Sequence, residues 1–202
     1  MSNLRAPGRL LRRHVVVSTL LLASLCGPAL AGSSATIPAG FKAYATTDIG
    51  GHRQCVVGAA TDDDGMNARA FAYVEDTATH KPQWVTPLPL GNPDWYQNRA
   101  THCLGDAGKV YALVQDDTQS QASLSQTFVT VATLDAASGK VQATQRVKVP
   151  EVKGGVSAWV NEGADHFRLE GGKVVVTGEY FQTSDRDVHK PFTASPSSPV
   201  SK

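Results

Sequence analysis

The sequence contains few cysteines and no stretch with the pattern of a long amphipathic helix. Its 202 residues include three cysteines, which form no CxxC pair, and this argues against the common redox and zinc motifs. Short runs rich in Val, Thr, Tyr and Phe recur instead, separated by turn residues. The sequence therefore predicts an all-β fold of successive antiparallel meanders, with about nine to eleven strands.

Recognisable catalytic motifs are also missing. No GxSxG, HExxH or HxH pattern occurs, so neither a serine nucleophile nor a zinc centre of these types is indicated. Two carboxylates brought together by the fold could still hydrolyse a glycosidic bond, although no particular pair stands out. The sequence therefore favours a noncatalytic protein but leaves enzymatic activity open. We expect no cofactor.

Positive charge is scarce outside the N-terminus. The chain has 19 Lys and Arg against 18 Asp and Glu, and four of the arginines lie in the first 31 residues, which contain no acid. Residues 32–202 therefore carry 15 basic and 18 acidic side chains, a net charge of −3. This balance provides no basic patch for nucleic acid or for an anionic membrane surface.

The N-terminal 31 residues have the three parts of a secretory signal peptide. Basic residues in Arg5–Arg13 precede the apolar run Val15–Leu25, and Ala29–Ala31 fits a cleavage site. We predict cleavage before Gly32, export to the periplasm or outside the cell, and no stable membrane insertion afterwards, because the apolar run is short for a membrane span. A twin-arginine signal and lipidation at Cys26 are alternatives that the neighbouring residues fit poorly.

Export leaves two cysteines, Cys55 and Cys103. In an oxidising compartment we expect them to form a disulfide. The bond would close a loop of about 50 residues, and the chain-entropy model gives such a loop a stabilisation on the order of 4 kcal/mol.

The exported part of the chain is divided by composition. Residues 32–40 read as a flexible leader, residues 41–182 as a single all-β domain, and residues 183–202 as a Pro- and Ser-rich disordered tail. Within the domain, Gln126–Leu134 is apolar or Thr on both faces and is predicted to be a central strand. Lys140–Val149 alternates, with Val141 and Val147 expected on one face and charges on the other, as in an edge strand.

Short turn motifs repeat along the domain. They are GDAGKVYAL at 105–113, LDAASGKV at 134–141, EDTATHKPQW at 75–84 and LEGGKVVV at 169–176. These motifs resemble the blade repeat of quinoprotein-type β-propellers, in which a strand ends in an Asp turn with Gly and a Trp follows. Asp76 matches Asp135 and Trp84 matches Ala143, so the Trp is present in only one of the two copies, and His80 replaces the Gly of the turn.

The resemblance implies propeller-like blades, with a β-sandwich as the alternative architecture. A closed propeller requires at least four four-stranded blades, and about 150 ordered residues are too few for it. No quinone cofactor follows from the resemblance, because the sheet repeat also serves noncatalytic scaffolds.

The candidate binding residues lie in the Pro-rich connection 87–99. Asp94, Trp95, Tyr96 and Arg99 are predicted on an irregular loop, and protein interfaces favour aromatic and Arg anchors. Alternatively, Trp95 closes the end of the β core. We expect a protein partner, with an inhibitor, immunity protein or scaffold as the type of function. A small secreted hydrolase or carbohydrate-active enzyme is the alternative, and the oligomeric state is not predicted.

Two sets of residues are secondary candidates for metal binding. Asp62 and Asp64 lie in an acidic hairpin tip, which does not fit the EF-hand spacing. His52 and His102 each lie close to one cysteine of the predicted disulfide and could meet in space. A solvated tip and ordinary loop histidines are the simpler interpretation, so no metal site is predicted.

Overall fold

The computed structural model describes residues 35–121, 125–150 and 152–196, and it confirms the all-β fold. The described residues form twelve strands and one short 3₁₀ helix, Ala164–His166. They contain no helix long and apolar enough to cross a membrane. The predicted signal peptide lies outside the described residues.

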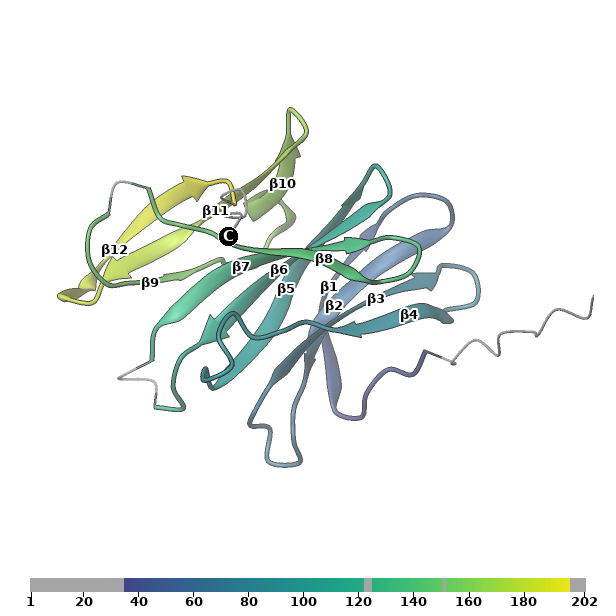
Figure 1. Ribbon diagram of the computed structural model, residues 1–202, viewed down its shortest axis with the longest axis horizontal. Helices are drawn as coiled ribbons and strands as arrows, with labels where there is room; N and C mark the ends of the chain where they lie inside the picture. The colour runs from purple at the N-terminus through teal and green to yellow at the C-terminus, as the bar shows by residue number, and fades with distance from the viewer. Residues whose placement is uncertain (1–34, 122–124, 151, 197–202) are drawn as a thin grey trace, which may run out of the picture. The chain divides into compact units, whose positions relative to one another are not determined.

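The strands form three antiparallel sheets of four strands, none of which closes into a barrel (Figure 1). Sheet A is a meander of β1 (Phe41–Asp48), β2 (Arg53–Ala60), β3 (Arg69–Asp76) and β4 (Pro82–Pro87). Sheet B is a second meander of β5 (Gln97–Asp106), β6 (Lys109–Asp117), β7 (Thr127–Asp135) and β8 (Val141–Arg146). As predicted, β7 is a central strand and β8 an edge strand.

Sheet C consists of β9 (Val156–Trp159), β10 (Phe167–Glu170), β11 (Lys173–Gln182) and β12 (Asp185–Ala194). Both β9 and β10 pair with β11, at its opposite ends. The prediction of a disordered tail from residue 183 is wrong over β12, which also raises the strand number above the expected range. This strand looks polar because it is an exposed edge with charges and Pro191, yet it pairs with β11 and buries Phe192.

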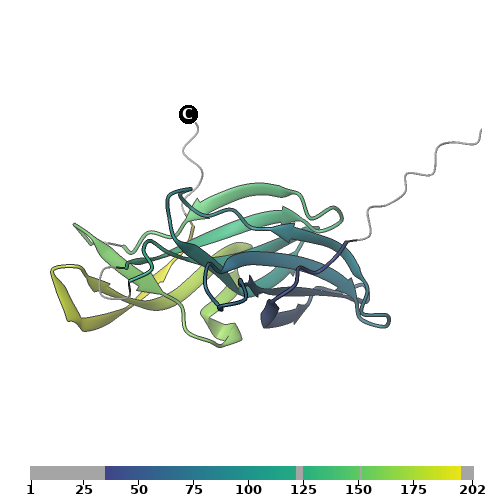
Figure 2. The ribbon, with the colours of Figure 1, turned by 90° about the horizontal axis from the view of Figure 1, so that it is seen from below.

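Sheet B lies between two apolar cores. Val110, Ala112 and Val114 of β6 pack in a first cluster with residues of sheet A. Leu113, between them in sequence, packs in a second cluster with residues of sheet C. Since successive side chains of a strand point to opposite faces, β6 and β7 are apolar on both sides. Figure 2 shows the sheets from a second direction.

The predicted turn repeat is present in three dimensions. Oδ1 of Asp76 accepts hydrogen bonds from the amides of residues 78 and 79, and Oδ1 of Asp135 accepts them from those of residues 137 and 138. His80 and Gly139 occupy the same place in the two turns, with φ of 52° and 72°. The same hairpin therefore joins the last two strands of sheets A and B. The family resemblance itself stays a prediction.

One expectation for β8 is wrong. Val141 packs against the first core cluster and Val147 is part of the second, so the two side chains lie on opposite faces of sheet B. The cause is a register shift between Thr133 and Leu134 in the pairing of β7 with β8. An irregularity of this kind inserts one residue and turns the following side chains to the other face.

Candidate functional site

The aromatic loop that was predicted to bind a partner folds back on sheet B. Trp95 is half-buried and stacks on Phe128, with ring centroids 4.8 Å apart and an interplanar angle of 28°. The guanidinium of Arg146 lies over both rings, 3.6 Å from the centroid of Phe128 and 5.6 Å from that of Trp95. Packing on sheet B therefore explains the position of the Trp95 side chain, and contact of Trp95 with a partner stays a prediction.

A buried carboxyl group lies close to this stack. Asp116 is fully buried and accepts hydrogen bonds from the amide of Gly91 (3.1 Å) and the hydroxyl of Thr130 (3.1 Å). Burial raises the pKa of Asp116, and these hydrogen bonds act in the opposite direction. Asp116 thus holds the start of the aromatic loop against sheet B.

The four predicted binding residues do not form one surface. Asp94 is exposed, whereas the main chain of Tyr96 is held by Asp117 and Arg69. Arg99 was expected in the irregular connection, but it lies in β5, because the strand already begins at Gln97.

Arg99 also lies on the face of sheet B opposite to Trp95. It pairs with Gln115, while Phe128, the stacking partner of Trp95, pairs with Asp116. Adjacent positions of β6 point to opposite faces. The Nη1 atom of Arg99 is 2.5 Å from Oδ2 of Asp117.

The secondary metal candidates are also separated. Asp62 accepts hydrogen bonds from the amide of Met66 and the side chain of Asn67, and the bond from Asn67 is the main reason why the pKa of Asp62 is lowered. Asp64 is exposed in the same turn, and His52 lies in the β1–β2 turn. Within residues 35–121, 125–150 and 152–196, no three His, Cys, Asp or Glu side chains are grouped as metal ligands.

His102 differs from the other candidates because it is buried. Its Nδ1 atom lies 3.0 Å from the hydroxyl of Thr101, and its Nε2 atom has no hydrogen-bond partner among the described residues. Burial is the main cause that lowers the pKa of His102. The lowered pKa favours the neutral form of this imidazole.

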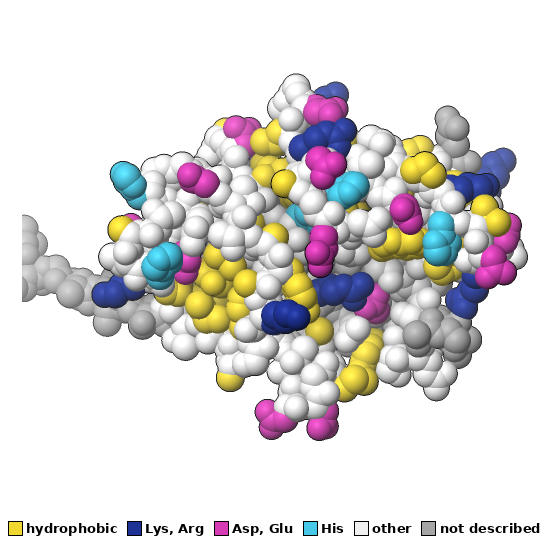
Figure 3. All heavy atoms as spheres, turned by 180° about the vertical axis from the view of Figure 1, so that it is seen from behind, with side chains coloured by type: hydrophobic (Ala, Val, Ile, Leu, Met, Phe, Trp, Pro, Cys, Tyr) yellow, Lys and Arg dark blue, Asp and Glu magenta, His cyan; other side chains and the backbone are white. Residues whose placement is uncertain are grey.

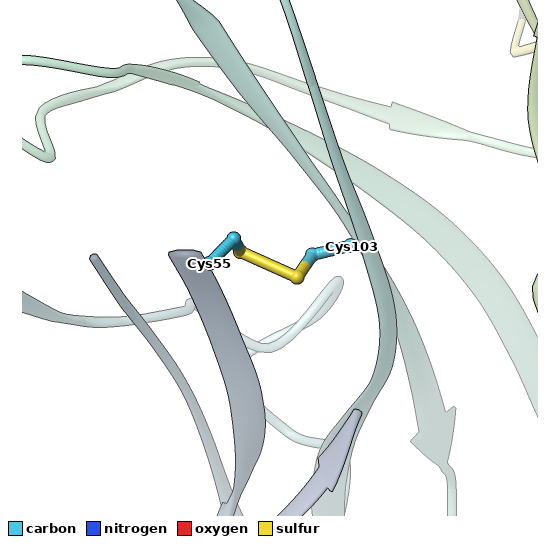
Figure 4. Close-up of a disulfide and its surroundings, with 2 residues drawn as sticks. All are labelled: Cys55 and Cys103. Carbon is cyan, nitrogen blue, oxygen red and sulfur yellow. A yellow bond between two sulfur atoms is a disulfide. The ribbon is translucent and has the colours of Figure 1, made fainter. Parts of the chain in front are cut away.

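The predicted cysteine pair is brought together. Cys55 on β2 and Cys103 on β5 lie within disulfide-bonding distance, with their Cα atoms 6.4 Å apart (Figure 4). Both side chains belong to the core cluster between sheets A and B. The bond therefore ties these two sheets together.

Sheet A has a second apolar face that sequence reasoning did not single out. Cys55 and Val57 of β2 and Ala72 and Val74 of β3 point into the first core cluster. By alternation, their neighbours point to the other face, which we call the outer face of sheet A. It is formed by Phe41, Val56, Phe71, Tyr73 and Val85, of which Val56, Tyr73 and Val85 are direct partners across β2, β3 and β4.

The outer face is apolar at its centre and polar at one end. Val56 and Tyr73 are 3% and 7% exposed, and Phe41, Phe71 and Val85 are half-buried around them. Hydrophobic side chains gather over sheet A in the view from behind (Figure 3). At one end, Glu75 accepts a hydrogen bond from Gln54 and lies 3.3 Å from His80. Neither core cluster of the described residues includes the outer-face side chains.

A signal for this face was present in the sequence. The runs CVVGA in β2 and AFAYV in β3 are apolar at successive positions, which is the pattern of strands covered on both sides.

No protein-family model and no curated protein matches this chain.

Proposed function

We propose that this is an exported, disulfide-stabilised β protein that binds another protein in the cell envelope or outside the cell. The outer face of sheet A is the proposed contact surface. One observation carries the proposal: β2 and β3 are apolar on both faces, whereas the core clusters of the described residues take up only one of them. On the outer face Phe41, Phe71 and Val85 stay partly exposed around the buried Val56 and Tyr73. Exposed apolar patches with polar rims are typical of protein-interaction sites.

The proposed partner presents a flat apolar surface, such as the face of another sheet. Sheets A, B and C already pack on one another in this way through two apolar clusters. Covering the exposed parts of Phe41, Phe71 and Val85 would contribute on the order of 1 kcal/mol for each side chain. The rim formed by Gln54, Glu75 and His80 would fix the orientation of the partner by hydrogen bonds.

The test is a Phe71→Glu substitution in the exported protein, used as bait against envelope and secreted fractions and read by mass spectrometry. A charge at Phe71, in the partly exposed part of the outer face, should abolish capture of the partner, because the carboxylate would be buried without a counter-ion. The matched control is Val188→Glu, since Val188 is a 45% exposed aliphatic residue on β12 of sheet C.

The expected result is one protein captured at equal stoichiometry by the wild type and by Val188→Glu, and lost with Phe71→Glu. Equal capture by all three proteins, or no stoichiometric partner for the wild type, would contradict the proposal. Thermal unfolding of each variant separates loss of binding from loss of fold.

A further inference from the structure

A cleft of about 600 Å³ lies where the first strands of the three sheets come together. We call it the inner cleft. Tyr44 of β1, Arg99 of β5 and Trp159 of β9 line it, together with Asp117 of β6 and Phe181 of β11. It is separate from the outer face of sheet A, and neither Trp95 and Tyr96 nor the acidic tip at Asp62–Asp64 lines it.

The floor of the inner cleft is a fixed polar network. Asp117 is 9% exposed and accepts hydrogen bonds from Arg99 (2.5 Å), Gln97 (3.0 Å) and Thr127 (2.7 Å). Beside it, Gln115 is 4% exposed and bonds both the amide and the carbonyl of Val160. These polar groups are held in place before any ligand arrives, which lowers the entropy lost on binding.

Aromatic rings form the walls of the inner cleft. Tyr44 is 43% exposed. The ring of Trp159 lies 6.0 Å from that of Phe181 and contacts His189 edge-on at 5.0 Å. Trp and Tyr combine a flat apolar surface with a polar atom, so the inner cleft offers stacking surfaces next to a polar floor.

Backbone irregularities concentrate at this cleft. Five register shifts interrupt the strand pairings of the described residues. Three of them fall at Tyr44, Thr101 and Phe181, and all three residues line the inner cleft. A β-bulge aims a side chain away from the regular alternation and is frequent beside binding sites. The fold thus departs from regular pairing where it points these side chains into the cleft.

From this geometry we infer that the inner cleft binds a neutral carbohydrate. Aromatic rings match the C–H faces of a sugar, and the side-chain amides of Gln97 and Asn161 can donate to and accept from its hydroxyl groups. The charge of Arg99 is balanced by Asp117, and Glu162 adds a negative charge to the lining. Phosphorylated or sulfated ligands therefore find no net positive charge here.

The inner cleft binds this sugar without hydrolysing it. Glycosidases use one carboxyl group as an acid and a second as a base or nucleophile. Asp117 and Glu162 both line the cleft, but the carboxylate of Asp117 is engaged by three donors, one of which is Arg99. A group held in this way positions other side chains rather than exchanging protons with a substrate.

The test is calorimetric titration of the protein, expressed from the full-length sequence in an exporting host. The probes are cellohexaose, chitohexaose, maltohexaose and, as the anionic comparison, a heparin hexasaccharide. We expect saturable binding of at least one neutral hexasaccharide. Trp159→Ala and Tyr44→Ala should each weaken it about tenfold, because each removes a stacking surface. Trp95→Ala, on the opposite face of sheet B, should leave the affinity unchanged.

Tyr44→Ala keeps the inference testable if Trp159→Ala fails to fold, because Tyr44 is exposed. No heat of binding with any neutral hexasaccharide at about 1 mM would overturn it. Tighter binding of the heparin fragment than of the neutral hexasaccharides would also overturn the inference. Unchanged affinity of Tyr44→Ala for the neutral hexasaccharide would overturn it as well. The inference is independent of the proposed protein binding, since Phe71→Glu should retain the sugar and Tyr44→Ala should retain the partner.

Discussion

Trp95 packs against its own loop and against two strands of sheet B. Its ring covers Phe128 and lies so close to Gly91 that a Cβ atom there would be 2.7 Å from the indole. Arg146 covers the same aromatic pair from the edge strand β8. Trp95 therefore joins its own loop to β7 and β8.

Trp95→Ala should consequently lower the free energy of unfolding by about 2 kcal/mol, roughly half of what a fully buried tryptophan loses. Urea unfolding measures this change. Met66→Ala is the control, because Met66 is 45% exposed in a hairpin tip, and its effect should stay within about 0.5 kcal/mol. An unchanged free energy of unfolding combined with lost partner capture would instead assign Trp95 to the interface.

Residue types in the sequence indicated candidate site residues, but they did not indicate the face of the sheet to which each side chain points. The cysteine pair was predictable because two cysteines in an oxidising compartment have one simple pairing. Trp95 and Arg99 looked like neighbours on one loop, whereas they lie on opposite faces of sheet B. That separation depends on where β5 begins, and strand boundaries are not marked by any residue in this stretch.

Among the elements, the β7–β8 turn holds sheets A and B together. The indole of Trp84 donates to the carbonyl of Ala136 (3.1 Å), and the hydroxyl of Thr86 donates to the carbonyl of Gly139 (2.8 Å). Both donors belong to β4. The bare Cα of Gly139 lets Trp84 approach, because a Cβ atom there would lie 2.5 Å from the indole.

Gly139→Ala should therefore destabilise the protein by more than the strain of its positive φ alone. Gly171→Ala is the matched control, since Gly171 has φ of 56° and open space around its Cα. The control should lose about 1 kcal/mol for left-handed backbone strain, and Gly139→Ala should lose clearly more, as measured by urea unfolding. Equal losses in the two variants would mean that Trp84 and Thr86 of β4 can move away from residue 139 without lowering the free energy of unfolding.

Turns and central strands were predictable because their chemistry is local. Asp135 and Gly139 mark their turn by side-chain hydrogen bonding and positive φ. The β-bulges were not predictable, because an inserted Tyr44 or Phe181 looks like any other strand residue. The strand β12 was missed because its stability comes from pairing with β11 and from Phe192, whereas its own composition resembles a tail.

At the scale of the whole domain, sheet stacking explains why the two proposed sites lie apart. Sheet B is covered by sheets A and C, so most of its buried apolar side chains are committed to the two cores. The outer face of sheet A lies outside these cores, and the inner cleft lies where the first strands meet. An apolar face suits a protein partner, and a polar cleft with aromatic walls suits a small ligand.

The Cys55–Cys103 pair should stabilise this arrangement as a whole. It joins β2 to β5 across the first core and closes a loop with a sequence separation of 48. A loop of this length corresponds to about 4 kcal/mol in the chain-entropy model. Reduction should therefore lower the urea midpoint of the wild type strongly, with a loss close to this value after linear extrapolation.

The Cys55→Ala/Cys103→Ala double variant provides the control for reduction, because dithiothreitol should not change its unfolding curve. Its free energy of unfolding should match or fall below that of the reduced wild type, since the substitutions also remove two buried sulfur atoms from the core. A loss below about 1 kcal/mol on reduction of the wild type would mean that the sheets hold together without the bond. In that case the contacts of Trp84 and Thr86 with the β7–β8 turn would be what fixes sheet A on sheet B.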